Sequence, residues 1–246
     1  MGNLAIAMPR QAAWTYLVLG GALGEDDLRA LADVCRLVQV DPQRPLLRAG
    51  DDRAAFVLEG TGKAHTVTRE GDQVITGMVD PGHAPGLVVA IGYGEAGTDV
   101  TALTPMRALL ISGPDLRRLV DQRPGIMAAC LATVSRQHAA ALEERLRFAG
   151  TSISQRVAQR LLELATRWGR VEGDRVVITL SMTQEELASW SGASRESVAK
   201  ALQGMRATGL LATGRRSLTI LDLPRLRQRC ERPDTAAVHR LLTRHA

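Results

Sequence analysis

The sequence predicts an α+β protein in which a β-roll, a long helix and a C-terminal winged helix-turn-helix follow one another along the chain. Short strands separated by glycine turns run from residue 42 to 112, a helical stretch covers 124–150, and two short helices flank a tight turn within 183–203. These observations divide the chain into a β-roll domain at 1–122, a long helix at 123–150 and a C-terminal domain at 151–246.

The composition is typical of a soluble globular protein with room for two ordinary domains: 246 residues, 45% apolar and 23% charged. The three cysteines, Cys35, Cys130 and Cys230, are far apart and form no Cys-x-x-Cys pair, so they indicate neither zinc nor an iron–sulfur cluster. They fit a reducing cytoplasm. The apolar segment 14–23 is short and is soon followed by acidic residues, so we expect neither a membrane span nor a signal peptide.

The first domain begins with a predicted helix at 23–40, where leucines recur at helical spacing and acidic residues occupy the first turn. The pattern then changes to short runs rich in Val, Leu, Ile and Thr between Gly, Pro and Asp, which is typical of a β-barrel or roll. Strands are predicted at 45–48, 54–59, 63–69, 73–79, 88–93, 99–102 and 107–111.

Helical structure is predicted again from residue 113, with a long helix at 126–148. A narrow stripe at three- and four-residue spacing follows this helix, and such a stripe suits a helix that lies against its own copy in a homodimer. An ordinary helix that packs on the roll is the alternative, and His138 is expected at the interface or in solvent rather than on a metal. The stripe consists of Met127, Cys130 or Leu131, Val134, His138, Ala141, Arg145 and Phe148.

The C-terminal domain is predicted to open with an amphipathic helix at 154–168. A charged turn and a short strand follow at 169–180. The tail at 224–246 contains a further partly amphipathic helix, which we expect to pack on this domain.

Two short helices with a turn between them are predicted at 183–203. Thr183 and Glu186 form a capping box, which supplies partners for backbone amides where the first helix starts. The small side chain of Ala188 lets the two helix axes approach closely, and Gly192 stands where the turn needs a positive φ. Ser191 departs from this pattern, because an apolar residue usually stands at its position.

The second helix starts at the cap Ser194, and its outward side chains have the chemistry of a major-groove reader. Arginine donates two parallel hydrogen bonds to guanine and glutamate accepts from a cytosine amino group, so Arg195 and Glu196 are expected to contact bases. A solvated helical face is the alternative. The inner face consists of Val198, Leu202 and Met205. The predicted DNA-binding residues are Thr183, Gln184, Ser194, Arg195, Glu196, Ser197, Lys200, Arg215 and Arg216.

A small hairpin wing is predicted after this helix. Gly209 is expected to cap the helix, and residues 210–220 are predicted to form a strand, a glycine turn and a second strand. Arg215 and Arg216 stand at the turn, where they are well placed to contact backbone phosphate. A solvated basic turn is the alternative.

Charge is distributed unevenly along the chain. From Arg145 to the end there are 18 Lys and Arg against 9 Asp and Glu, a net charge of about +9, whereas the first 144 residues carry about −4. The basic part contains the helix-turn-helix, and release of counter-ions from DNA phosphates favours that arrangement.

The order of elements and several motifs resemble those of the CRP/FNR family of bacterial transcription regulators, which includes the catabolite activator that binds cyclic AMP. The resemblance covers roughly residues 25–225, and its most specific part is Gly192–Val198. Segments 56–60, 80–82 and 153–158 support it. It implies a cyclic-nucleotide-binding-like sensor domain, a dimerisation helix, and double-stranded DNA, a second copy of the chain and RNA polymerase as partners.

The resemblance also implies a mode of base reading. Arg195 would contact a guanine, Glu196 the neighbouring C·G or A·T edge, and Lys200 the next base. Lysine lacks the rigid fork of guanidinium, so discrimination at that base is expected to be looser. The implied operator is a palindrome with half-sites similar to TGTGA, about one helical turn apart.

The sensor domain departs from cyclic-AMP binders in three places. Leu87 stands where the family's ribose-binding glutamate is expected, and no Lys or Arg occurs from Glu70 to Met106 to hold a phosphate. Ala141 and Leu142 stand where hydroxyl residues meet the purine. The sequence therefore argues against cyclic AMP, predicts no cofactor, and leaves the effector unknown.

Several other effectors stay open. An oxygen-sensing cluster needs several cysteines near the N-terminus, where Cys35 stands alone. A collapsed pocket in an effector-independent protein, or an apolar or uncharged ligand, are further alternatives. Haem would need an axial ligand from among His65, His83, His138 and Cys35. A cyclic dinucleotide would use arginines near the domain junction, such as Arg145, Arg147 and Arg156.

A different class of function is a barrel-based ligand carrier or interaction module whose C-terminal domain binds DNA only weakly. An enzyme is not expected, because the chain shows no nucleophile–base pair, phosphate loop or metal-ligand set at recognisable spacing.

Overall fold

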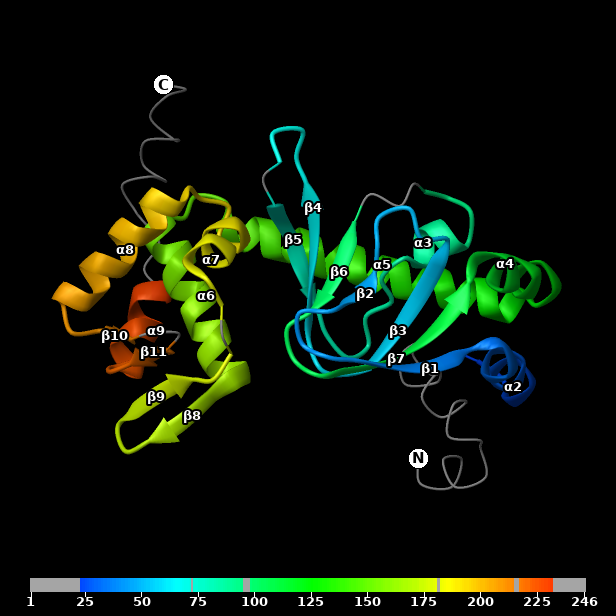
Figure 1. Cartoon of the computed structure of the whole chain (residues 1–246), viewed down its shortest axis with the longest axis horizontal. Coiled ribbons are helices and arrows are strands. Elements are labelled where there is room, and N and C mark those ends of the chain that lie inside the picture. Colours follow the sequence, from blue (N-terminus) through cyan, green and yellow to red (C-terminus); the bar gives the residue numbers. More distant parts are fainter. Residues whose placement is uncertain (1–22, 72, 95–97, 181, 215–216, 232–246) are drawn as a thin grey trace. The chain divides into compact units, whose positions relative to one another are not determined.

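The computed structural model describes residues 23–71, 73–94, 98–180, 182–214 and 217–231 (Figure 1). The segment 14–22 and the tail from residue 232 onward, on which part of the sequence predictions fall, lie outside the described residues. The chain forms two compact units, Met1–Leu142 and Glu143–Ala246. Their boundary falls inside the long helix, whereas the sequence predicts boundaries on either side of it.

The first unit contains the predicted β-roll, built from two antiparallel sheets (Figure 1). One sheet has the order β1 (Arg36–Val40), β7 (Met106–Ser112), β3 (Arg53–Glu59). The other has the order β2 (Pro45–Leu47), β6 (Asp99–Ala102), β4 (Gly62–Val67), β5 (Gln73–Val79).

Strand β3 shows how side-chain alternation builds two cores. Ala55 and Val57 point into the space between the sheets, while Ala54 and Phe56 point to the opposite side, where helices cover the sheet. None of these four side chains has exposed surface. The strand is therefore apolar on both faces because both faces are covered.

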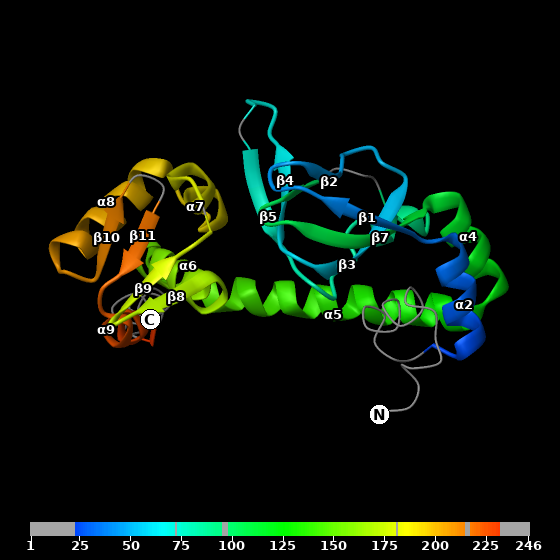
Figure 2. The same ribbon diagram turned by 60° about the horizontal axis from the view of Figure 1, so that its bottom comes forward.

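Helices enclose the outer face of the β1–β7–β3 sheet. Figure 2 shows the first half of α5 running along the roll beneath β3. Helix α4 begins at the cap Ser112, whose Oγ accepts a hydrogen bond from the Asp115 amide at 3.2 Å. An ion pair between Arg123 and Asp27, at 3.0 Å, ties the end of α4 to α2. The helices are α2 (Glu25–Val34), α4 (Gly113–Gln122) and α5 (Pro124–Phe148).

The first predicted helix is shorter than the 23–40 that the sequence indicates. It ends at Val34, because Cys35 adopts an extended conformation and the chain continues as β1. The residues of β1 pair with β7, from Arg36 opposite Leu110 to Val40 opposite Met106. The pairing partner is far along the chain, so local periodicity did not reveal it.

The predicted strand at 88–93 is wrong, because the helix α3 (Leu87–Ala90) forms there. Gly86, at a φ of +77°, turns the chain into this helix. Leu87 and Ala90 then lie on one side of the helical turn and are buried in the helix-covered core. Burial of this face outweighs the β propensity of the valines between them.

The first half of α5 belongs to the core of the first unit. Cys130 has no exposed surface, and Met127 and Val134 pack against the same core. This corrects the sequence prediction for Cys130, because a fully buried side chain cannot lie at an interface between two copies. Burial raises the pKa of the Cys130 thiol to about 11. Burial and the nearby Asp115 raise the pKa of Cys35 to about 12.

The second unit is arranged around α6 (Ile153–Trp168), which contacts both helices of the helix-turn-helix, the last helix and the first hairpin. A capping box of Ser152 and Gln155 starts α6. The other elements are β8 (Gly169–Glu172), β9 (Arg175–Ile178), α7 (Gln184–Trp190), α8 (Arg195–Ala207), β10 (Leu211–Gly214), β11 (Ser217–Ile220) and α9 (Leu223–Glu231).

The strands of this unit form one antiparallel sheet in the order β10-β11-β9-β8. The predicted wing is confirmed as the β10–β11 hairpin, with Leu211 opposite Ile220. The sequence predicts a single strand at 169–180, whereas two strands pair there around Gly173, at a φ of +60°. Of the predicted tail helix, the described part is α9.

The buried hydroxyl group of Ser191 is expected to lower the free energy of unfolding of the second unit. Its side chain is 1% exposed, and its Oγ has no hydrogen-bond partner among the described residues. We expect Ser191→Ala to raise the free energy of unfolding by about 1 kcal/mol in urea denaturation, because a buried unpaired hydroxyl costs about 1–3 kcal/mol. Destabilisation by this substitution would contradict the assignment of an unpaired hydroxyl.

Candidate nucleic-acid interface

The first helix of the helix-turn-helix starts with the predicted capping box. Thr183 Oγ1 accepts from the Glu186 amide at 3.0 Å, and Glu186 Oε2 accepts from the Thr183 amide at 2.8 Å. Leu187 and Ala188 are buried on the inner side of α7. Thr183 and Gln184 are exposed at the helix start, where their side chains are accessible to a phosphate.

The turn between α7 and α8 is held by α6. Gly192 has a φ of +59°, the conformation that the sequence predicts for it. Its carbonyl oxygen accepts a hydrogen bond of 3.0 Å from Arg156 Nη1. The same arginine lies 3.2 Å from the position that a Cβ at residue 192 would take. Glycine therefore permits both the positive φ of the turn and the close approach of Arg156.

The second helix, α8, presents the predicted reading side chains at its exposed start. Ser194 caps it, with its Oγ accepting from the Ser197 amide at 3.2 Å. Arg195, Glu196 and Lys200 are exposed and have no hydrogen bond or ion pair within the described residues. Their polar groups are therefore available to a ligand. The apolar face on the opposite side consists of Val198, Leu202 and Met205, all buried.

The wing adds polar groups next to α8. Arg206 Nη1 donates to Thr213 Oγ1 at 3.1 Å, which ties the helix to β10. The predicted phosphate contacts Arg215 and Arg216 lie outside the described residues, so their role stays a prediction.

A buried arginine that the sequence analysis missed lies behind the turn. Arg160 of α6 donates from Nε to the carbonyl oxygen of Trp190, at 3.2 Å, and pairs with Glu163 and Glu144. Its guanidinium carbon is 4.2 Å from the centre of a Trp190 ring and 4.5 Å from that of Phe148. The feature of the sequence that could have pointed to Arg160 is its spacing from Arg156, because the two arginines lie one helical turn apart on the same face of α6.

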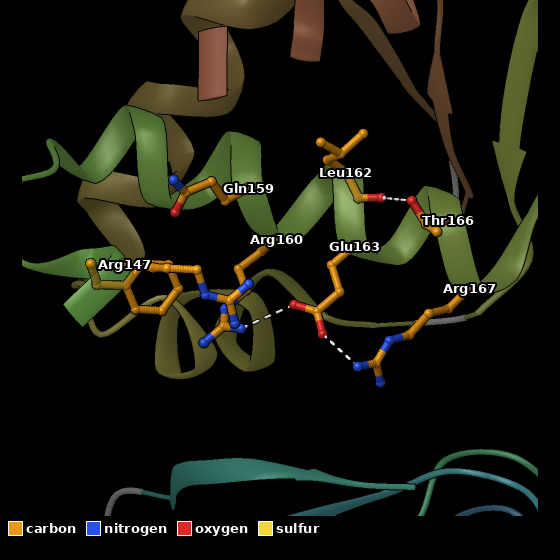
Figure 3. Close-up of a pocket in the computed structure, with 8 residues that line it drawn as sticks. Arg147, Gln159, Arg160, Leu162, Glu163, Thr166 and Arg167 are labelled. Carbon is orange, nitrogen blue, oxygen red and sulfur yellow. Dashed lines mark hydrogen bonds and ion pairs between the residues drawn. The ribbon is translucent and has the colours of Figure 1, made fainter. Parts of the chain in front are cut away.

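An open pocket of about 420 Å³ lies beside this arginine (Figure 3). Figure 3 shows Glu163 between Arg160 and Arg167, bonded to both. Two of the three arginines that line the pocket thus share the carboxylate of Glu163. The third, Arg147, is exposed and has no ion pair among the described residues. The pocket is lined by Arg147, Phe148, Gln159, Arg160, Leu162, Glu163, Thr166 and Arg167.

Helix α5 carries an exposed apolar row that includes Leu131, the alternative to Cys130 in the predicted stripe, together with leucines outside that stripe. Leu131, Leu142 and Leu146 are 64%, 49% and 64% exposed and lie on one face, because they are eleven and four residues apart. His138 and Arg145, from the predicted stripe, are exposed near the same face. Ala141 is also exposed, whereas Phe148 is half-buried against Arg160.

Buried apolar side chains from both sheets line the space between the two sheets of the first unit. Leu47, Val57 and Met106 are among the buried apolar side chains there. A Cβ on Gly86, at the start of α3, would lie 2.2 Å from the Arg53 carbonyl oxygen, so backbone already occupies that position.

Two cations, Arg117 near α3 and Lys63 in the second sheet, have partners within the protein. Arg117 makes two hydrogen bonds to Asp52, at 3.0 and 2.8 Å, and one of 3.1 Å to the Ala90 carbonyl oxygen. The hydrogen bond from Arg117 holds the pKa of Asp52 below its usual value. Lys63 is buried and donates to Gln73 Oε1 at 2.8 Å.

Two of the candidate haem ligands, His65 and His83, make hydrogen bonds to neighbouring groups of the protein. His65 contacts Thr101 Oγ1 and Gln73 Nε2 through its two ring nitrogens, at 2.9 and 3.0 Å. His83 Nδ1 accepts from the Asp80 amide at 3.0 Å. Within the described residues, no group of three or more His, Cys, Asp and Glu side chains is arranged to hold a metal ion. In the same part of the chain, no helix has both the length and the apolarity to cross a membrane.

Two family profiles match the chain, one in each unit. Residues 155–229 match the Crp-like helix-turn-helix domain. Residues 37–123 match the cyclic nucleotide-binding domain.

Similar proteins agree with both matches. A CRP-like cAMP-activated global transcriptional regulator of Mycobacterium tuberculosis is 30% identical over 178 residues, 72% of this chain and 80% of the relative. Transcriptional regulator SdrP of Thermus thermophilus is 31% identical over 186 residues, 73% of this chain and 85% of the relative. The solved structure of a CRP/FNR family regulator from Thermus thermophilus superposes with a TM-score of 0.68 at 27% identity, over 80% of this chain and all of that chain. The chain therefore belongs to the CRP/FNR family of DNA-binding transcription regulators.

Proposed function

We propose that this protein regulates transcription as a homodimer that binds a palindromic operator with TGTGA-like half-sites. The observation that supports this best is the exposed group Arg195, Glu196 and Lys200 at the start of α8. A major groove admits one helix, and these are the side-chain types that distinguish base pairs in it. The positive end of the α8 dipole favours approach to DNA phosphates.

Base reading and phosphate contact are divided between elements. Arg195 contacts guanine with its fork of donors, Glu196 accepts from a neighbouring base, and Lys200 contacts the next base with less discrimination. Thr183 and Gln184 at the start of α7 contact the backbone and set the register of α8 on the duplex.

The exposed apolar face of α5 is the proposed dimer interface. Leu131, Leu142 and Leu146 lose exposed surface if a second copy of α5 covers them, and His138 and Arg145 lie at the edge of the same face. A two-fold symmetric dimer then presents two copies of α8 to two inverted half-sites. We infer RNA polymerase as a further partner and the cytoplasm as the location from this role.

The effector is proposed to be something other than cyclic AMP. The cyclic-nucleotide family match implies that ligand, but the residues present do not fit it. Leu87 is buried where a ribose-binding carboxylate is expected, and the nearby cation Arg117 is paired with Asp52. A cyclic phosphate without a free cation would lose its water without gaining a charge-assisted partner.

The proposed function predicts that Arg195→Ala abolishes the preference for a TGTGA palindrome. Loss of a bidentate base contact costs about 1–3 kcal/mol per half-site, so a symmetric operator with two half-sites should bind roughly 30-fold more weakly or worse. Competition binding against a scrambled duplex measures this loss, with size-exclusion chromatography to check that the dimer is intact.

Arg206→Ala is the matched control, because Arg206 is an exposed arginine of the same helix that lies near its other end, where it donates to Thr213. Its preference for the palindrome should stay close to that of the wild type. Equal preference in wild type and Arg195→Ala would contradict base reading by α8 and favour a carrier or interaction module that binds DNA weakly.

Cyclic AMP is expected to leave the protein unchanged. Isothermal titration should show no saturable binding up to about 1 mM, and operator affinity should change by less than about twofold. Saturable binding that strengthens operator affinity would contradict the proposal. A Soret band in freshly purified protein would identify haem as the effector instead.

A further inference from the structure

Arg160 connects three elements of the second unit: the last turn of α5, helix α6 and the end of α7. Its side chain is 6% exposed. The guanidinium carbon lies 4.5 Å from the ring centre of Phe148, at the end of α5, and 4.2 Å from that of Trp190, at the end of α7. Both aromatic rings are therefore within cation–π distance of the guanidinium.

The edges of the guanidinium are occupied as well. Nε donates to the Trp190 carbonyl oxygen at 3.2 Å, Nη1 to Glu163 at 3.1 Å, and Nη2 to Glu144 of α5. The pairing with Glu163 is visible in Figure 3. A lysine could not make these contacts together, because its ammonium is neither planar nor forked.

The contact to Trp190 acts on the turn of the helix-turn-helix. Trp190 is the last residue of α7, and carbonyl groups at a helix C-terminus carry partial negative charge, which suits a cation. Arg156 donates to the Gly192 carbonyl oxygen two residues later. Two arginines of α6 thus hold the carbonyls on either side of Ser191, and Arg160 alone of the two extends the connection to α5.

We propose that Arg160 is a positioning residue that holds α7, and through the turn α8, at a fixed angle to the last turn of α5. The proposal rests on the function above, in which α5 lies at the dimer interface and α8 reads DNA. Any rotation of the helix-turn-helix relative to α5 changes the distance between the two copies of α8. Arg160 therefore sets which half-site spacing the dimer accepts.

A merely structural arginine would behave differently. Its loss would weaken binding to every operator by a similar factor, because fewer molecules would be folded. Loss of a positioning contact instead flattens the preference among spacings. One added base pair rotates a half-site by about 35° and moves it by about 3.4 Å, so spacing is a sensitive measure of the angle between the reading helices.

The test removes the α5 side of the connection and leaves the Trp190 hydrogen bond in place. Full-length Glu144→Ala/Phe148→Ala is compared with wild type on duplexes that carry two inverted TGTGA half-sites at the best spacing, and at one base pair shorter and longer. Glu143→Ala/Arg147→Ala is the matched control, because both residues are exposed neighbours on the same helix. Binding to a scrambled duplex and a thermal melt report folding.

We expect wild type and control to prefer one spacing by about tenfold, and the Glu144→Ala/Phe148→Ala variant by about twofold, with binding to the scrambled duplex unchanged. Arg160→Lys keeps the positive charge but loses the forked guanidinium, and it should show the same reduced preference among spacings. This variant replaces the double variant in the test if the double variant does not fold. A variant that keeps the wild-type ratio while binding more weakly at all spacings would overturn the proposal. Wild type without preference for the palindrome would overturn the proposed function and this inference with it.

Discussion

Burial of the apolar face of α8 is the constraint on which the candidate interface depends. Val198, Leu202 and Met205 are at most 1% exposed, and α8 packs against α6 and α7. Each such side chain contributes about 1.5–3 kcal/mol when it leaves water. Because a helix has one buried face here, the side chains at positions 195, 196 and 200 have to point outward, which makes them available for base contact.

The two units show opposite uses of charge. In the first unit, Arg117 next to α3 is paired with Asp52, Lys63 of the second sheet is buried and bonded to Gln73, and buried apolar side chains line the space between the sheets. In the second, the arginines of α6 organise the turn, while the side chains of Arg195 and Lys200 on α8 have no partner within the described residues. Charge that is already compensated inside the protein gains little from a ligand, whereas exposed uncompensated charge releases counter-ions on binding DNA.

Local signals were predictable from sequence, and long-range ones were not. The caps at Thr183 and Ser194 and the turn at Gly192 are confirmed, because each depends on a few neighbouring residues. Strand β1 and helix α3 depend on partners far along the chain, which periodicity does not reveal. Cys130 was predicted at a dimer interface because the residues of a core-facing row and those of a dimer-facing row recur at the same spacing along a helix. The role of Arg160 was not predicted because its partners come from α5, α6 and α7, and the sequence alone does not show that these three elements meet.

The central claim is that α8, presented twice by a symmetric dimer, recognises a specific sequence. Selection of binding sites from a random duplex library tests it most directly, because it assumes neither the half-site nor the effector. A symmetric dimer that reads DNA through α8 should enrich two inverted copies of one short half-site, with centres about one helical turn apart. Enrichment of a single asymmetric site, or no enrichment over a control without protein, would contradict it.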